Sequence, residues 1–175
     1  MKTSVIVLLV ILGIGVLALP VLAVLAGMLL PALAKAKAKA QEIRCLNNLK
    51  NLGSAARIYA TDTDGKFPGT WLQVTNELAV PKLLTCPADP QHAPTADWSS
   101  ITAANISYPF YGRGGNDSQT NRVLTICPAH GHVLLGDGST FRHSKGAPPL
   151  PTVTRDGILW MDERPLEMRQ GQRSP

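Results

Sequence analysis

Two cysteines and a group of histidines are the residues whose types and spacing could do chemistry. Cys86 and Cys127 are each followed by Pro-Ala. A disulfide between them would close a loop of about 40 residues and constrain the unfolded chain by a few kcal/mol. Two unpaired thiols are the alternative, and the disulfide is expected only where the surroundings are oxidising.

The same cysteines could instead bind zinc. Cys127, His130 and His132, with Cys86 or His92, offer the thiolate and imidazole ligands that zinc prefers. The sequence lacks the Cys-x-x-Cys pair that makes a zinc prediction specific. Histidines exposed on a loop are therefore the favoured interpretation, and neither a metal nor a cofactor is predicted. Because no third group is evident to orient a Cys127–His130 pair, the protein is not predicted to be an enzyme.

The third cysteine belongs to a helical pattern. Cys45, Leu49, Leu52, Ala56 and Tyr59 recur at spacings of 4, 3, 4 and 3 residues, which places them on one face of a helix. We expect this face to pack on the globular part of the chain. There an unpaired Cys45 would behave as a small hydrophobic residue.

The N-terminal segment is apolar. No charged residue occurs from Ser4 to Ala34, and this run exceeds the about 20 residues that a helix needs to cross the hydrocarbon core of a membrane. A signal peptide is the alternative, but signal cores are much shorter. Residues 1–34 are therefore predicted to be a transmembrane helix.

Residues 35–60 are predicted to continue this helix as a basic amphipathic neck. The chain carries a formal charge of +5, and the neck, with six basic residues against one acidic residue, accounts for the whole of this excess. Lipid phosphates are the favoured partner of such a neck. Nucleic acid is not expected, because the neck lacks the interleaved aromatic residues on which bases would stack. The basic residues are Lys35, Lys37, Lys39, Arg44, Lys50 and Arg57.

Residues 61–168 are predicted to form a small α+β head. Asp62, Asp64 and Gly65, followed by Pro68 and Gly69, indicate that the helix stops. Short apolar segments separated by turn residues then predict a small antiparallel sheet laid against the helix. The tail, residues 169–175, is predicted to be disordered. The segments are residues 71–74, 82–85, 106–111, 122–126, 132–135 and 157–161.

Several motifs together resemble a known family. The stretch MLLPALAKAKAKAQEIRCLNNLKNLGSAARIYATDTDGKFP, residues 28–68, is similar to the neck of type IV pilin-like proteins related to the major pseudopilin of type II secretion, a group abundant in planctomycetes and verrucomicrobia. The pieces LLTCPADP, ISYPFYGRGG and VLLGDGS agree with it. In VLLGDGS, Asp137 and Gly138 match the family hallmark, an Asp-Gly pair ten residues after a His. They predict a tight turn between strands.

The chain departs from this family at three places. Alignment on Pro31 puts the family's prepilin cleavage site between Leu9 and Val10 and its acidic residue at Ile14, and neither feature is present. The hallmark His falls at Cys127. We therefore expect Met1 or Lys2 to be retained in the mature protein, and the missing acid removes a reason to expect filament assembly.

The resemblance implies a membrane-anchored pseudopilin-like envelope protein with a structural or secretion-associated role. Its expected partners are the lipid bilayer and other pilin-like or secretion-system subunits, with no small-molecule substrate. The resemblance also implies a single-pass protein of the inner (cytoplasmic) membrane with a periplasmic head, although the lysines after Ala34 favour a cytoplasmic head. The alternatives are a periplasmic metal- or thiol-handling module using Cys86, Cys127, His130 and His132, and a minor pilin-like subunit that captures DNA.

Overall fold

The computed structural model describes residues 2–143, 150 and 152–161, and within the first part of the long helix it describes the side chains of residue 25 and of residues from 27 onward. The chain divides into two compact units, Met1–Ala40 and Gln41–Pro175.

The first element, α1 (Lys2–Asp62), is a single long helix. It ends in a left-handed turn, since Asp64 and Gly65 have φ angles of 53° and 80°. The Gly65 amide donates a hydrogen bond of 2.8 Å to the carbonyl of Ala60, and the Thr63 hydroxyl donates one of 2.7 Å to the carbonyl of Tyr59. These bonds satisfy carbonyl groups that the last helical turn would otherwise leave unpaired.

The expected membrane anchor is contradicted. Within the part of the chain that the structure describes, no helix is both long and apolar enough to cross a membrane. The predictions of a fold with a membrane-spanning helix, of a transmembrane single-pass protein and of an inner-membrane location are therefore wrong.

Four short 3-10 helices follow α1. The first two occupy positions where the sequence predicted strands, at residues 71–74 and 82–85, so those predictions are wrong. Pro81 begins the second of them, and its fixed φ suits a first helical turn. Residues 106–111 also form no strand. The four helices are η1 (Trp71–Val74), η2 (Pro81–Leu84), η3 (Trp98–Ser100) and η4 (Ala103–Asn105).

Two small antiparallel sheets complete the described chain. The first has the order β1 (Val123–Ile126), β2 (Val133–Leu135) and β3 (Thr140–Phe141), with Ile126 opposite Val133 and Val133 opposite Phe141. The second pairs β4 (Thr152–Arg155) with β5 (Ile158–Met161). The two sheets meet where the Met161 amide donates a hydrogen bond of 3.0 Å to the carbonyl of Asn121.

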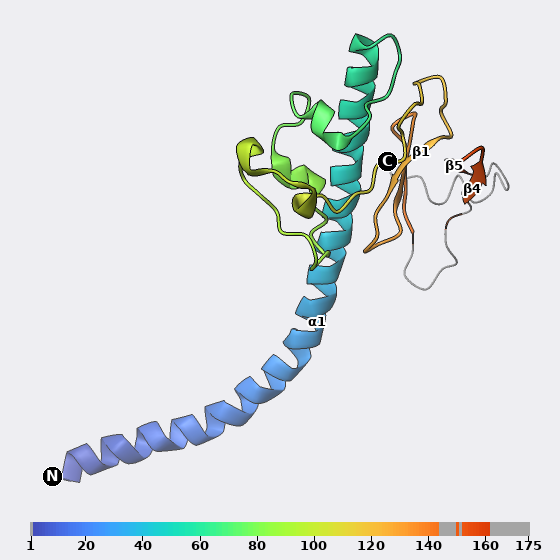
Figure 1. The fold of residues 1–175 in the computed structure, drawn as a ribbon. Coiled ribbons are helices and arrows are strands. Elements are labelled where there is room, and N and C mark those ends of the chain that lie inside the picture. Colours follow the sequence, from blue (N-terminus) through green and yellow to red (C-terminus); the bar gives the residue numbers. More distant parts are fainter. Residues whose placement is uncertain (1, 144–149, 151, 162–175) are drawn as a thin grey trace. The chain divides into compact units, whose positions relative to one another are not determined.

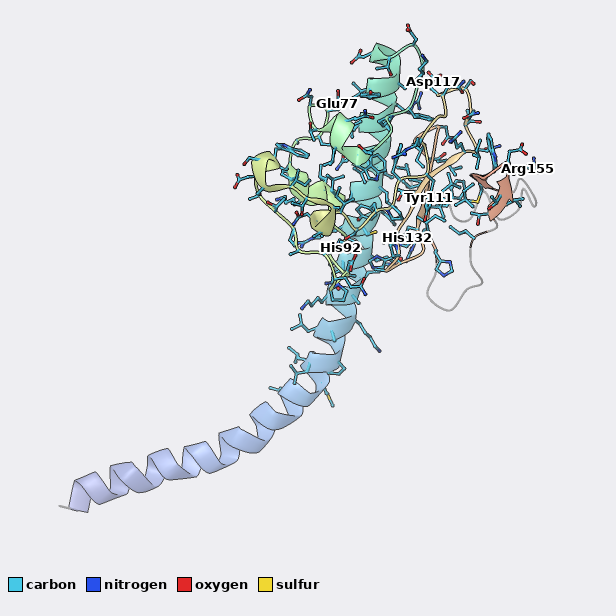
Figure 2. The ribbon with its side chains drawn as sticks, in the orientation of Figure 1. Glu77, His92, Tyr111, Asp117, His132 and Arg155 are labelled. Atoms are coloured by element: carbon cyan, nitrogen blue, oxygen red, sulfur yellow. The ribbon has the colours of Figure 1, made fainter. Side chains whose placement is uncertain are left out.

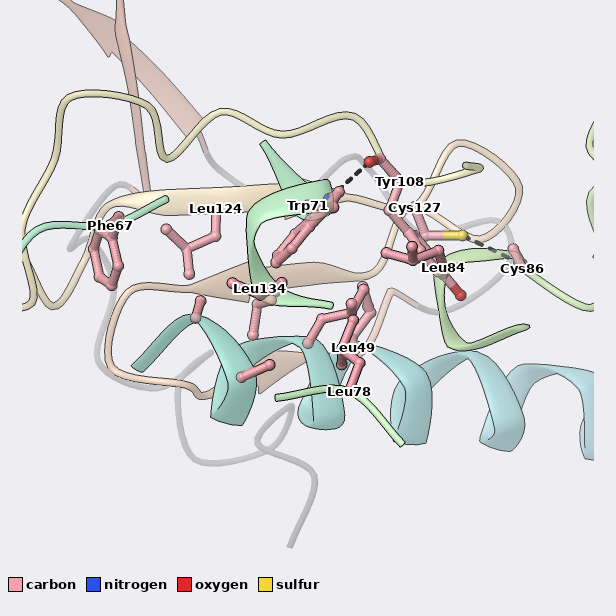
Figure 3. Close-up of a cluster of buried hydrophobic side chains, with 14 of the residues drawn as sticks. Leu49, Phe67, Trp71, Leu78, Leu84, Cys86, Tyr108, Leu124, Cys127 and Leu134 are labelled. Carbon is pink, nitrogen blue, oxygen red and sulfur yellow. Dashed lines mark hydrogen bonds between the residues drawn. The ribbon is translucent and has the colours of Figure 1, made fainter. Parts of the chain in front are cut away.

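The main core lies between the second part of α1, the 3-10 helices and the three-stranded sheet, and Figure 1 shows the 3-10 helices and this sheet on different sides of the helix. Leu49, Leu52 and Ala56 are fully buried, and Tyr59 is half-buried. Trp71 fills the space above the helix, and its indole Nε1 donates a hydrogen bond of 2.9 Å to the carbonyl of Tyr108 (Figure 3). The core is thus mainly aliphatic around one tryptophan.

The Asp137-Gly138 turn joins β2 to β3 and contacts α1. Gly138 has a φ of 84°, and its amide donates a hydrogen bond of 3.0 Å to the carbonyl of Leu135. Asp137 caps the turn by accepting a bond of 2.8 Å from the amide of Ser139. Arg57 of α1 donates a bond of 2.7 Å to the carbonyl of Asp137. The turn therefore tethers the sheet to the helix.

Candidate metal centre

Three segments far apart in the sequence bring three cysteines and one histidine together. Cys45 lies on the buried face of α1, and Cys86 lies two residues after the end of η2. Cys127 and His130 lie in the turn between β1 and β2, which is closed by a hydrogen bond of 2.7 Å from the Gly131 amide to the carbonyl of Cys127. All three cysteines are buried, and His130 is half-buried.

The possible ligand atoms are close to one another. The Sγ atoms of Cys86 and Cys127 are 3.6 Å apart (Figure 3). The Nδ1 atom of His130 lies 3.4 Å from Sγ of Cys86 and 3.7 Å from Sγ of Cys127. Together with Sγ of Cys45, all four atoms lie within 4.8 Å of one another.

These distances match the edges of a zinc tetrahedron. With Zn–S bonds of about 2.3 Å and Zn–N bonds of about 2.0–2.1 Å, tetrahedral angles place two sulfur ligands about 3.8 Å apart and a sulfur and a nitrogen about 3.6 Å apart. The three edges of the Cys86, Cys127 and His130 triangle in the structure lie close to these values. The set of three cysteines and one histidine is also a common ligand set of structural zinc sites.

The surroundings shift the pKa values of the three cysteines in different directions. Hydrogen bonds from Cys127 and then Cys45 lower the pKa of Cys86. The pKa of Cys45 is raised, first by its hydrogen bond with Cys127, then by that with Cys86 and by burial. For Cys127, the hydrogen bond with Cys45 lowers the pKa, but the bond to Cys86 and burial outweigh it and raise the pKa to about 11. The surroundings of Cys86 thus favour its ionised form, whereas those of Cys45 and Cys127 disfavour theirs.

Neighbouring groups orient the cluster. The Tyr108 hydroxyl donates a hydrogen bond of 3.5 Å to Sγ of Cys45, and burial, the largest cause, raises the pKa of this hydroxyl. The Cys86 amide donates a bond of 3.0 Å to the hydroxyl of Ser107. Such contacts to a ligand hold it in position and tune its basicity.

Two histidines considered from the sequence do not join the cluster. His132 stacks on His130 with ring centroids 5.1 Å apart, but its Nδ1 accepts a hydrogen bond of 2.9 Å from the amide of His143. His92 is paired with Asp89 through a 2.7 Å contact between Nδ1 and Oδ2. Figure 2 labels His92 and His132 at separate positions in the head. The turn thus selects His130 over His132.

Cys45 is the member that sequence reasoning left out of the site. Its helical periodicity with Leu49 and Leu52 predicts a buried face, and all three side chains are fully buried. A cysteine on such a face can meet other cysteines across the core, but helical spacing alone carries no signal of this. Cys86 and Cys127 are free thiols in the structure, so their disulfide stays a prediction.

Comparisons of the chain with family models, with curated proteins and with solved structures find no match. The resemblance to pilin-like proteins therefore stays a prediction from the motifs quoted above.

Proposed function

We propose that this protein contains a structural zinc centre formed by Cys45, Cys86, Cys127 and His130. The observation that carries the proposal is the agreement between the 3.4, 3.6 and 3.7 Å edges of the Cys86, Cys127 and His130 triangle and those of a tetrahedral zinc site. Four protein ligands leave no open coordination position, which is typical of structural rather than catalytic zinc.

The role of the zinc is to hold three parts of the head together. Cys45 comes from α1, Cys86 from the segment after η2, and Cys127 and His130 from the β1–β2 turn. A head of this size has a modest core, and a metal is a common supplement to such a core. Because zinc binds the folded chain and its ligands are scattered in the unfolded chain, its binding free energy adds to the stability of the fold.

Cobalt substitution tests this proposal. The purified full-length chain, reduced and freed of metal, is titrated with Co²⁺ while visible absorption is recorded. We expect one Co²⁺ per chain, with tetrahedral d–d bands and a thiolate charge-transfer band that Zn²⁺ abolishes. Cys86→Ser should weaken the charge-transfer band, whereas His92→Gln, the matched control near the centre, should leave it unchanged. A titration without tetrahedral bands would contradict the proposal.

We propose as a second function that the protein is a pilin-like subunit that associates with other pilin-like subunits through the first part of α1. The supporting observation is a run of apolar side chains against which no other described part of the chain packs. Met28, Leu29, Leu30 and Leu33 have 62–71% of their surface exposed, and exposed apolar patches of this kind mark interaction sites.

Sedimentation of the full-length chain tests this second proposal. The wild type should form oligomers whose size depends on concentration, and Leu29→Gln with Leu33→Gln should shift the equilibrium to monomer. Exchange of the exposed Lys66 for Gln, far along the chain from this patch, should not change it. Oligomers that persist unchanged in the double variant would contradict the proposal.

A further inference from the structure

A cavity in the head is lined by one of the four proposed zinc ligands. It has a volume of about 610 Å³, within the range of small-molecule sites. Cys86 lines it, whereas Cys45, Cys127 and His130 are not among its lining residues. A reagent that enters the cavity would therefore meet Cys86 before any other ligand of the centre.

The rim of the cavity is suited to an anion. Arg44 and Lys82, both exposed, lie on its lining together with the amide side chain of Asn47. Its acidic residue, Asp89, is paired with His92. The cavity thus offers two cationic side chains beside a buried sulfur, which favours a small molecule that carries carboxylates.

From these contacts we propose that the cavity binds a low-molecular-weight disulfide bearing carboxylates, which oxidises the centre to a Cys86–Cys127 disulfide and releases the zinc. This inference rests on the zinc centre proposed above. Cys86 and Cys127 are the pair joined, because their Sγ atoms are already 3.6 Å apart and a disulfide needs about 2.05 Å.

The reaction has two balanced steps. The Cys86 thiolate attacks one sulfur of the bound disulfide, whose S–S bond breaks, and one thiolate leaves as a mixed disulfide forms. The Cys127 thiolate then attacks Sγ of Cys86, the second thiolate leaves, and the Cys86–Cys127 bond is made. The two cysteines lose two electrons and the reagent gains them, with no net proton change between thiolates. Zinc keeps only Cys45 and His130 and dissociates.

The exchange has a specific structural consequence. Zinc joins α1 to both loops through Cys45, whereas the disulfide joins only the segment after η2 to the β1–β2 turn. Oxidation would therefore release Cys45 from the centre while the two loops stay joined. The centre acts as a redox switch on the packing of α1 against the head.

The test treats the zinc-loaded full-length protein with oxidised glutathione, which is anionic, or with 2-hydroxyethyl disulfide, which is uncharged. Zinc release is followed with a chromogenic chelator, and the disulfide is located by peptide mapping. We expect one zinc released per Cys86–Cys127 disulfide, with Cys45 still open to alkylation and zinc binding restored by dithiothreitol. Arg44→Gln and Lys82→Gln should each slow the reaction with glutathione about three- to tenfold and leave that with the uncharged reagent unchanged. Lys66→Gln is the matched control.

The outcomes separate the two proposals. A chain that never binds zinc contradicts the zinc centre itself. A chain that binds zinc tightly but keeps both the metal and three alkylatable thiols under these reagents contradicts only the switch. A disulfide that includes Cys45, or equal rates for both reagents in the wild type and the two cavity variants, overturns the assignment of the pair or of the anionic ligand.

Discussion

The Tyr108 hydroxyl donates a hydrogen bond of 3.5 Å to Sγ of Cys45, in a buried contact between a loop and α1. Tyr108 is fully buried, and its backbone carbonyl accepts a hydrogen bond from the indole of Trp71. Hydrogen bonds therefore fix this residue both at its backbone and at its hydroxyl. Tyr108 is thus a positioning residue for a ligand of the centre.

Tyr108→Phe should therefore weaken zinc binding without dismantling the core. Loss of a hydrogen bond to a ligand typically lowers metal affinity about 10- to 100-fold, while the ring and the carbonyl contact to Trp71 are retained. Competition with a chelator of known affinity measures the change. Tyr111→Phe, at a more exposed tyrosine of the following segment, should leave the affinity unchanged. An unaltered affinity in Tyr108→Phe would exclude the hydroxyl from the centre.

The buried face of α1 should dominate the stability of the head. Leu52 is fully buried, and replacement by Ala should lower the free energy of unfolding by about 2–5 kcal/mol through the cavity that it leaves. Ile58 on the same helix is 51% exposed, and Ile58→Ala should cost much less. Urea unfolding of the zinc-loaded proteins compares the two. Equal losses would mean that Leu52 does not pack on the head.

Arg122 should stabilise the head as a buried cation held by neutral acceptors. It is 2% exposed, burial lowers its pKa, and its guanidinium donates hydrogen bonds of 2.6 and 2.9 Å to the Arg113 carbonyl and the Gln119 side chain. Arg122→Met would leave these acceptors without a donor, at an expected cost of about 2–4 kcal/mol. Arg155→Met, at an exposed arginine of β4, should change stability by less than about 0.5 kcal/mol. Denaturant titration of the wild type and both variants measures these changes in the free energy of unfolding.

His132 should make the head sensitive to acid. It is fully buried, and burial, the largest cause, lowers its pKa from 6.5 to about 4. Between these values the unfolded chain binds more protons than the folded chain, so stability falls as the pH drops through this window, by roughly 3 kcal/mol in all.

The acid effect is measured as the difference between wild type and His132→Asn, which keeps an acceptor for the His143 amide. Both proteins are unfolded in urea at pH 7 and pH 4.5 with a chelator present, so that loss of zinc does not contribute. The wild type should lose more stability than the variant over this interval. Parallel losses would show that His132 is not buried in its neutral form.

The sequence predicted those features of the fold that depend on local pattern. The helix face from Cys45 to Ala56 and the turn at Asp137 and Gly138 follow from spacing and from residues that tolerate left-handed conformations. Strand predictions failed at residues 71–74 and 82–85, because a segment of four residues is too short for its periodicity to distinguish a 3-10 turn from a strand. The polar β4 (Thr152–Arg155) and the very short β3 (Thr140–Phe141) carry too little alternation to be recognised.

The centre could be predicted only in part. The ligand types of Cys127, His130 and His132, with Cys86 or His92, indicate a possible zinc site in the sequence. That Cys45 completes the set depends on how α1 packs against both loops, which is tertiary information. The preference for His130 over His132 depends on the turn closed by Gly131, whose φ of 70° cannot be read from histidine spacing.

The central claim is that Cys45, Cys86, Cys127 and His130 together bind one zinc ion, and X-ray absorption at the zinc edge tests it most directly. The full-length protein, purified under reducing conditions and supplied with one equivalent of zinc, should show three sulfur ligands at about 2.3 Å and one nitrogen ligand at about 2.0–2.1 Å. Cys45→Ser should lower the sulfur count to two. A first shell of oxygen and nitrogen alone, or a sulfur count that Cys45→Ser does not change, would contradict the account.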